Sequence, residues 1–267
     1  MTDDFTQKYG RWAVIAGASE GIGASLADQL AERGLNLVLI ARNQKLLAEV
    51  ADGVRERHGV GVKAVVQDLT DSEVAAKLAE ATDGLDIGLV IYNAGASDRT
   101  TTFLETGFDH ALKQIKLDCI GPVALVDLFG PAMRDRGRGG IVLVASLACV
   151  AGAATLAVYS AVKAFQHNFA EGLWAELREF GVDVCCTPLG ATYTPALQRM
   201  GVEYDADMQM LSEDVAREIT ENIGNGPVHV VGENNRAVAS QIWTVDRRML
   251  VEMMSAASID FANKRKA

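Results

Sequence analysis

Cysteine and histidine are scarce in this 267-residue chain, and neither occurs at the spacing of a metal site or a redox pair. The four cysteines are Cys119, Cys149, Cys185 and Cys186, and no two of them form a Cys-x-x-Cys motif. Three of the four stand in apolar stretches, so we expect buried, reduced thiols and a cytoplasmic protein. The four histidines are scattered as well, and we therefore predict no metal site.

Long apolar runs and an excess of positive charge are also missing. No run approaches the ~20 apolar residues of a membrane-spanning helix, and the first residues show no signal-peptide pattern. The formal net charge is −10, which disfavours binding to a phosphate backbone or to an anionic membrane surface. Neither nucleic acid nor a membrane is an expected partner, so a small molecule is the expected one.

Internal repeats, low-complexity segments and Pro- or Ser-rich linkers are absent from the sequence. We therefore expect one domain over residues 1–267, long enough for a sizeable core. A Met-containing stretch near residues 191–211 is interpreted as a lid over the substrate, although Met suits ordinary core filling equally well. Residues 235–261 are predicted to form an amphipathic C-terminal helix.

What the sequence does contain is a regular alternation of short apolar runs with helical stretches. The predicted strands lie at 11–16, 35–40, 62–66, 87–92, 141–144, 182–186 and 227–231. Helical patterns separate them, as in repeated βαβ units. The predicted fold class is α/β, with about seven parallel strands in one doubly wound sheet and helices on both of its faces.

The segment from Gly140 to Lys163 carries the clearest catalytic pattern. Ser146 follows the apolar run 141–144, and Tyr159 lies four residues before Lys163 on the same face of a predicted helix. A phenol with a reference pKa near ~10 is a poor base at neutral pH, and an ammonium one helical turn away lowers that pKa. A serine hydroxyl at the strand end can bind the same substrate oxygen. The trio predicts proton transfer to or from an alcohol or carbonyl oxygen.

A glycine-rich turn follows the first predicted strand. Gly17, Gly21 and Gly23 have the spacing G-x3-G-x-G, and a helix is predicted directly after them. Such a turn lets backbone N–H groups and a helix N-terminus approach a pyrophosphate. The spacing differs from the G-x-G-x-x-G of the usual dinucleotide fingerprint, and a bare glycine turn is the alternative interpretation.

The end of the second predicted strand favours NADP over NAD. An acidic residue there binds the ribose hydroxyls of NAD, whereas an arginine accommodates the 2′-phosphate of NADP. Ala41 leaves no acid at this point and Arg42 supplies a cation, although an exposed arginine at a helix start is common. NADP is therefore the expected cofactor, with NAD as the alternative.

Together these motifs resemble the short-chain dehydrogenases/reductases, over nearly the whole chain from Arg11 to about Val231. The similarity includes the glycine turn, Ser146 with Tyr159-Ser160-Ala161-Val162-Lys163, and Asn93-Ala94-Gly95 after the fourth strand. It implies a Rossmann-type fold. The cofactor-binding residues that it implies are Gly17, Ser19, Glu20, Gly21, Ile22, Gly23, Arg42, Asp68, Leu69, Asn93, Ala94, Gly95, Tyr159, Lys163, Pro188, Gly190, Thr192 and Thr194.

Two parts of that set leave alternatives open. Asp68 matches an adenine-contacting Asp-Leu pair of the family, or it caps a helix that begins near Asp71. The family's Pro-Gly-x-x-x-Thr is interrupted by one extra residue between Pro188 and Gly190. Thr192 and Thr194 therefore both qualify for the nicotinamide contact.

Asp118 departs from the family pattern, in which most members carry an asparagine. The resemblance implies that residue 118 joins Ser146, Tyr159 and Lys163 in a catalytic tetrad, with its backbone carbonyl holding a water that helps to return the tyrosine proton. Pro122 has no N–H, so it leaves that carbonyl without its helical donor. We expect Asp118 to keep this geometry but to place a buried negative charge opposite Lys163, which opposes the phenolate.

The resemblance implies reversible hydride transfer between a nicotinamide and a carbonyl or secondary alcohol. Tyr159 would exchange the proton of the substrate oxygen, Lys163 would assist it and hold the cofactor ribose, and Ser146 would orient the oxygen. Apolar residues around the site indicate an apolar substrate, and members commonly form homodimers or homotetramers through two long helices, here near 105–134 and 156–178. The alternative is a cofactor-binding regulatory or scaffold protein of the same fold with little turnover.

Overall fold

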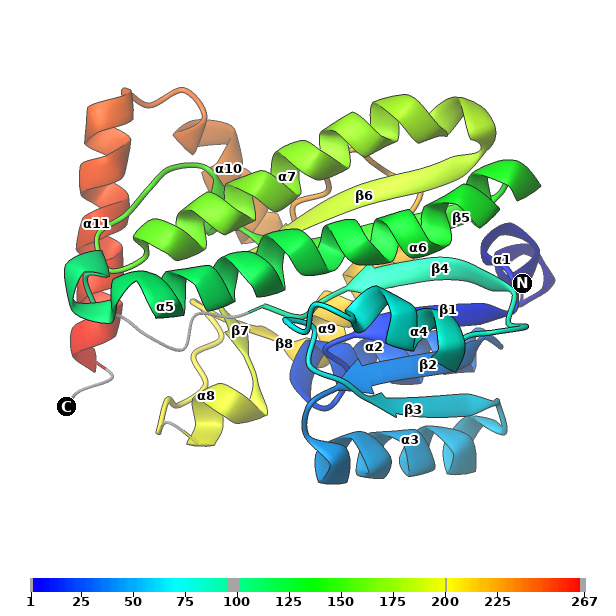
Figure 1. Ribbon diagram of the computed structural model, residues 1–267. Helices are drawn as coiled ribbons and strands as arrows, with labels where there is room; N and C mark the ends of the chain where they lie inside the picture. The colour runs from blue at the N-terminus through cyan, green and yellow to red at the C-terminus, as the bar shows by residue number, and fades with distance from the viewer. Residues whose placement is uncertain (1, 96–100, 200, 265–267) are drawn as a thin grey trace.

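The computed structural model describes residues 2–95, 101–199 and 201–264, and its centre is a sheet of six parallel strands (Figure 1). The strand order is β3-β2-β1-β4-β5-β6. The strands are β1 Trp12–Ala16, β2 Asn36–Ala41, β3 Val62–Val66, β4 Ile87–Tyr92, β5 Gly139–Ser146 and β6 Val182–Leu189. The predicted doubly wound α/β sheet is confirmed. Its order reverses between β1 and β4, which is where open sheets of this kind bind ligands.

The seventh predicted strand, 227–231, forms only an isolated parallel bridge between Cys186 and Val228. The Cys186 N–H donates to the Pro227 carbonyl at 2.8 Å, and the His229 N–H donates to the Cys186 carbonyl at 2.9 Å. The segment therefore lies beside β6 as predicted. Pro227 has no N–H to add to the ladder, so the regular sheet has six strands and not about seven.

Helices cover both faces of the sheet, because successive side chains of a strand point to opposite sides. The helices over one face are α2 Gly21–Glu32, α3 Gln44–His58 and α9 Ser212–Glu221. Those over the other face, nearer the viewer in Figure 1, are α4 Val74–Ala81, α6 Gly121–Arg136 and α7 Ala157–Leu177. Within β1, Ala13 and Ile15 belong to the first core and Val14 and Ala16 to the second.

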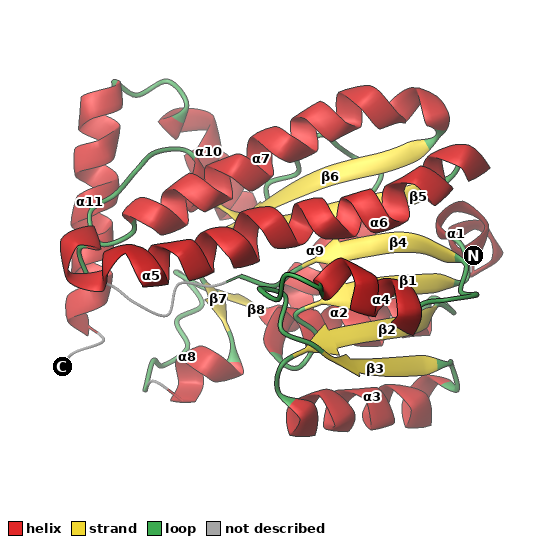
Figure 2. Cartoon of the chain, in the orientation of Figure 1, coloured by secondary structure: helices red, strands yellow, loops and turns green. Residues whose placement is uncertain are grey.

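The predicted lid region holds three short elements that lie off one end of the sheet (Figure 2). They are β7 Thr192–Tyr193, α8 Pro195–Arg199 and β8 Met210–Leu211, and β7 pairs with β8 in a small parallel sheet. Residue 200 of this region lies outside the described residues.

The predicted C-terminal helix 235–261 is divided into two helices, α10 Glu233–Ile242 and α11 Arg247–Lys264. Asp246 causes the second start, since its carboxylate accepts the N–H groups of Arg248 and Met249 at 3.0 and 3.1 Å and so caps a new helix. Helix α1 (Thr2–Tyr9) was not predicted. No helix of the described residues has both the length and the apolar character needed to cross a bilayer.

A π-helical turn joins α5 (Phe103–Ile115) to α6, over Lys116–Ile120. The Gly121 N–H donates to the Lys116 carbonyl, so the Leu117 carbonyl lacks its usual helical donor, and Pro122 offers none to Asp118.

Two side chains satisfy these carbonyls. The Tyr92 hydroxyl donates to Leu117 O at 2.5 Å, and Gln166 Nε2 donates to Asp118 O at 3.0 Å. Burial raises the pKa of Tyr92 well above its usual value, and the charge of Asp118 adds to this, so the phenol stays protonated and remains a donor. The missing donor predicted at Pro122 is therefore part of a change of helix pitch, which hydrogen bonds from β4 and α7 stabilise.

Replacing Tyr92 with phenylalanine is expected to lower the free energy of unfolding by about 1–3 kcal/mol, because the Leu117 carbonyl would be buried without a donor. Urea denaturation measures the change. Tyr204→Phe is the matched control, since Tyr204 is 44% exposed and surface changes usually stay within about 0.5 kcal/mol. Equal, small effects of the two substitutions would show that the π-turn does not depend on the phenol.

Candidate active site

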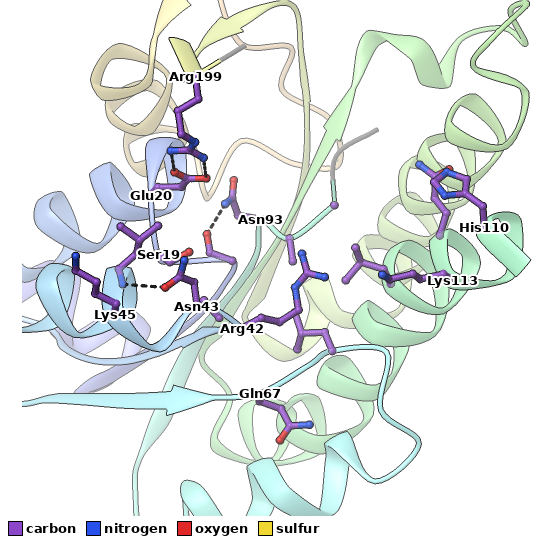
Figure 3. A pocket seen from close by; sticks show the side chains of 18 residues that line it. Ser19, Glu20, Arg42, Asn43, Lys45, Gln67, Asn93, His110, Lys113 and Arg199 are labelled. Atoms are coloured by element: carbon purple, nitrogen blue, oxygen red, sulfur yellow. Dashed lines mark hydrogen bonds and ion pairs between the residues drawn. The ribbon is translucent and has the colours of Figure 1, made fainter. Parts of the chain in front are cut away.

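A pocket of about 970 Å³ opens where β1, β2 and β4 end (Figure 3). The turns after these three strands supply most of its wall, and one face of α5 closes it from the side. The lining residues are Gly17, Ser19, Glu20, Ala41, Arg42, Asn43, Lys45, Leu46, Gln67, Leu69, Asn93, Ala94, Gly95, His110, Lys113, Gln114, Leu117 and Arg199. No group of His, Cys, Asp or Glu side chains in the described part of the chain could hold a metal ion.

The glycine turn needs glycine for steric reasons. Gly17 has a φ of 84°, and a Cβ on it would lie 2.9 Å from the backbone of Ala94. A Cβ on Gly23 would lie 1.9 Å from the Gly17 carbonyl oxygen. Asn93 Nδ2 donates to that same oxygen at 2.9 Å and ties the end of β4 to the turn. Gly17 therefore leaves bare backbone at the pocket, where a diphosphate can approach it, and Gly23 lets the start of α2 pack against the turn.

Cationic side chains border the pocket beyond β2. Arg42 is exposed there, and Lys45 and Lys113 line the same pocket. The Asp68 carboxylate accepts hydrogen bonds from the N–H and the hydroxyl of Thr70 at 2.9 and 2.8 Å. Burial raises the pKa of Asp68, but the Thr70 hydrogen bonds and the charges of Arg42 and Lys113 outweigh burial, so the pKa is below its usual value. Asp68 thus stabilises the turn that contains Thr70. It does not cap α4, since that helix begins only at residue 74.

Several expected cofactor residues do not line this pocket: Gly21, Ile22, Gly23, Asp68, Tyr159, Lys163, Pro188, Gly190, Thr192 and Thr194. The two threonine candidates differ in position. A Cβ on Gly21 would lie 3.3 Å from Thr194 Cγ2, so Thr194 adjoins the glycine turn. Thr192 pairs with Met210 in the small sheet.

Ten lining residues were not in the predicted set, among them Lys45, Gln67, His110, Lys113, Gln114 and Arg199. The spacing of His110, Lys113 and Gln114 places them on one helical face, but nothing in the sequence tells which way that face points. Arg199 of α8 forms a two-pronged ion pair with Glu20 of the glycine turn, at 2.7 and 2.8 Å. The lid region therefore contacts the turn directly (Figure 3).

The structure brings Tyr159 and Lys163 together at the start of α7, beside the end of β5. Lys163 Nζ lies 5.7 Å from the centre of the Tyr159 ring and donates to the Val144 carbonyl at 3.3 Å. Ser146 ends β5, and its hydroxyl oxygen accepts the Ala148 N–H at 3.2 Å. Tyr159 is half-buried and lines a small pocket; two of that pocket's residues, His110 and Gln114, also line the large one.

Lys163 and Asp118 form a buried ion pair. Lys163 is 1% exposed and Asp118 is 0% exposed, and Nζ lies 3.0 Å from Oδ1. Burial lowers the pKa of Lys163, but the Asp118 carboxylate outweighs it, so the pKa is above its usual value and the ammonium is kept. Burial raises the pKa of Asp118, and Lys163 opposes that rise. Asp118 Oδ2 accepts no hydrogen bond from any described residue, so Lys163 provides the charge compensation for this carboxylate.

Gln166, which the sequence analysis missed, completes the surroundings of Lys163. Its Oε1 accepts from Lys163 Nζ at 3.0 Å, and its Nε2 donates to the Asp118 carbonyl at 3.0 Å. Gln166 lies three residues after Lys163, a spacing that indicates a contact between the two side chains. A glutamine on a helix is ordinarily a surface residue, so the sequence does not predict its burial.

Comparison with known proteins gives three relevant relatives. A 7beta-hydroxysteroid dehydrogenase of Clostridium sardiniense is 29% identical over 93% of this chain and 95% of its own. A very-long-chain 3-oxoacyl-CoA reductase of Neurospora crassa is 38% identical over 66% and 54%, respectively. An inactive hydroxysteroid dehydrogenase-like protein 1 of Homo sapiens is 32% identical over 68% and 56%. The chain thus spans about half the length of the last two relatives.

Solved structures show a similarity to dehydrogenases as well. A structure of a 7beta-hydroxysteroid dehydrogenase is 25% identical, with 94% of this chain and 98% of that chain covered and a TM-score of 0.87. A short-chain dehydrogenase from Sphingobium yanoikuyae in complex with NADPH is 28% identical over 86% and 91%, with a TM-score of 0.77. A family model described as short chain dehydrogenase matches residues 11–205, from the first strand into the lid region. The chain belongs to the short-chain dehydrogenase family.

Proposed function

We propose that the protein is an NADP-dependent oxidoreductase that transfers a hydride between the nicotinamide and a carbonyl or secondary alcohol on an apolar substrate. The observation that carries the proposal is the position of Tyr159 above the buried Lys163 ammonium, next to a pocket of dinucleotide size. A phenol beside a fixed cation is suited to give up and regain one proton.

The residues of the large pocket fit such a cofactor. Gly17 leaves bare backbone for a diphosphate, and Arg42 with Lys45 offers cations for a 2′-phosphate. The NADPH complex of a structural neighbour supports the same choice. When bound, the nicotinamide supplies or accepts the hydride.

The proposed catalytic side chains have separate roles in the proton transfer. In reduction Tyr159 gives its proton to the substrate oxygen, and in oxidation it takes that proton back. Ser146 binds the same oxygen from the end of β5, and the Lys163 ammonium stabilises the phenolate. Asp118 fixes Lys163 and partly offsets its charge. Lys163 Nζ donates to Val144 O and Gln166 Oε1 and lies 3.0 Å from Asp118 Oδ1; the 3.3 Å bond to Val144 is the longest of these contacts, so we expect it to give way first to a ribose hydroxyl.

An apolar substrate is proposed on two grounds. The lid region carries the Tyr193 and Tyr204 rings 5.4 Å apart, and its Met208 is 71% exposed. Two relatives are named for hydroxysteroids and for very-long-chain 3-oxoacyl-CoA. Both names describe an oxygen function on a large apolar body.

The second candidate is a cofactor-binding regulatory or scaffold protein with little turnover. The buried charge of Asp118 favours it, because that charge weakens the effect of Lys163 on the phenolate. One relative is named as an inactive hydroxysteroid dehydrogenase-like protein. The presence of Ser146, Tyr159 and Lys163 together favours the enzyme, since a scaffold needs none of them.

A homo-oligomer is also proposed, formed through α5 and α7. These neighbouring helices expose large apolar side chains, among them Leu104 at 90%, Phe108 at 70% and Phe165 at 39%. Exposed apolar surface of this kind is typical of an interface.

Arg42→Ala is expected to weaken NADPH binding by roughly 10- to 100-fold, since a charge-assisted contact contributes about 1.5–3 kcal/mol. NADH binding should change little, because NADH has no 2′-phosphate. Titration of cofactor fluorescence measures both affinities. Arg178→Ala, at the far end of α7, is the control. Equal loss for both cofactors would remove Arg42 from the 2′-phosphate site.

Tyr159→Phe is expected to lower kcat for carbonyl reduction by about 10²- to 10⁴-fold, the usual contribution of a general acid. NADPH affinity should be preserved, because the ring and the pocket stay in place. NADPH consumption over a panel of apolar ketones is the measurement, with Tyr9→Phe in α1, outside both pockets, as control. If the natural protein binds NADPH but consumes no more of it than the variant, the scaffold candidate is favoured.

Asp118→Asn is expected to move the pH profile of alcohol oxidation to lower pH, by roughly one unit or more. Oxidation needs the phenolate, and the carboxylate 3.0 Å from Lys163 opposes it. Without that negative charge the ammonium stabilises the phenolate more strongly, so a less basic solution suffices. Asp135→Asn, at an exposed ion pair, is the control. An unchanged kcat and pH profile would contradict this role of Asp118.

A further inference from the structure

Gln166 lies fully buried in α7, and its one carboxamide contacts two unlike groups. Its oxygen accepts an ammonium proton of Lys163, and its NH2 group donates to the backbone carbonyl of Asp118, each at 3.0 Å. Its exposed fraction is 0%. A buried amide with both ends bound holds its partners in one geometry.

The Asp118 carbonyl needs an external donor because of Pro122. A residue with an N–H at position 122 would complete the helical bond, and proline cannot. A buried carbonyl of this kind is satisfied by a water molecule or by a side chain. Here the side chain is Gln166, so the amide stands where a water molecule would otherwise bridge the Asp118 carbonyl and the Lys163 ammonium.

The ammonium of Lys163 is enclosed by three oxygen atoms. Nζ donates hydrogen bonds to Val144 O at 3.3 Å and Gln166 Oε1 at 3.0 Å, and it lies 3.0 Å from Asp118 Oδ1 in an ion pair. All four residues are at least 96% buried. On the side of α5 and α6, the described residues therefore leave the ammonium no contact with solvent.

An amide and a water molecule differ in whether they can transfer a proton between two groups. Water accepts a proton on its oxygen and releases another, so a bridging water can pass a proton on. A neutral carboxamide only donates through its NH2 and accepts through its oxygen, and it has no readily released proton. The contact through Gln166 therefore holds Lys163 in place without carrying a proton from solvent.

We propose that Gln166 is a positioning residue that shields the inner side of the Tyr159–Lys163 pair from water, so that Tyr159 exchanges its proton with solvent through the pocket. The inference rests on the proposed function. In reduction the phenol O–H bond breaks, the substrate oxygen gains that proton, and a proton from solvent then converts the phenolate back to the phenol. Tyr159 is half-buried and lines the small pocket with Thr155 and His110, which gives that proton a path.

The test measures how fast the Lys163 ammonium protons exchange with water. The full chain is prepared with ¹⁵N-labelled lysine side chains, with and without NADPH, and Lys163→Arg identifies the signal by its loss. We expect the Lys163 ammonium to exchange far more slowly than an exposed lysine such as Lys45. Gln166→Ala should accelerate the exchange by at least about tenfold, because one charge-assisted hydrogen bond is lost and space for water is created.

A second variant keeps the amide but shortens the side chain by one methylene. In Gln166→Asn the amide cannot reach both partners, so a water molecule can bind beside Lys163 and pass a proton on. The proposal expects faster exchange here too, whereas a purely structural role for Gln166 predicts no change. This variant also carries the test if Gln166→Ala does not fold. Thr220→Ala, at a buried polar residue of α9, controls for general destabilisation.

Fast exchange in the natural protein overturns the proposal, and so does slow exchange that neither Gln166 variant accelerates. The measurement needs no substrate, so it separates the inference from the proposed function. If no carbonyl is reduced, the proposed function fails while the exchange rates still decide whether Gln166 shields Lys163. If carbonyls are reduced and exchange is fast, only the inference fails.

Discussion

A buried ammonium has to be compensated, and the arrangement around Lys163 follows from that requirement. An unpaired charge in a protein interior is strongly destabilising, so three separate parts of the chain bring oxygen atoms to Nζ. They are the end of β5, the π-helical turn before α6, and the next turn of α7. The position of Tyr159 relative to the sheet is fixed by the same contacts, because Tyr159 lies one helical turn before Lys163.

The second organising feature is the close approach of backbone at the glycine turn. The Gly17 carbonyl lies against Gly23 and accepts a hydrogen bond from Asn93, so the turn, the start of α2 and the end of β4 form one rigid unit. The pocket proposed for the cofactor is built on this unit, whereas the proposed proton chemistry depends on Lys163. His110 and Gln114 of α5 border both pockets and connect the two.

Local patterns predicted the fold well and the site only in part. Apolar runs with glycine, arginine or asparagine at their ends defined β1, β2 and β4, because those features depend on neighbouring residues alone. Pro227 weakened a strand that its apolar neighbours suggested. Gln166 and Arg199 meet partners far away in the sequence, and His110 lines two pockets with distant residues, so their roles depend on packing that no short segment reveals. Asp246 is a residue type that commonly caps a helix, so a second helix start there could have been predicted. The amphipathic pattern continues on both sides of Asp246, and one continuous helix was predicted instead.

The Glu20–Arg199 ion pair has a consequence for the order of binding events. Both side chains are partly exposed, at 31% and 58%, and exposed pairs of this type contribute only about 0–1 kcal/mol. Thermal motion therefore separates α8 from the glycine turn readily, and dissolved salt makes separation easier. Under the proposed function, opening of this pair would give a dinucleotide access to the glycine turn, and a binding order of cofactor first and substrate second would follow.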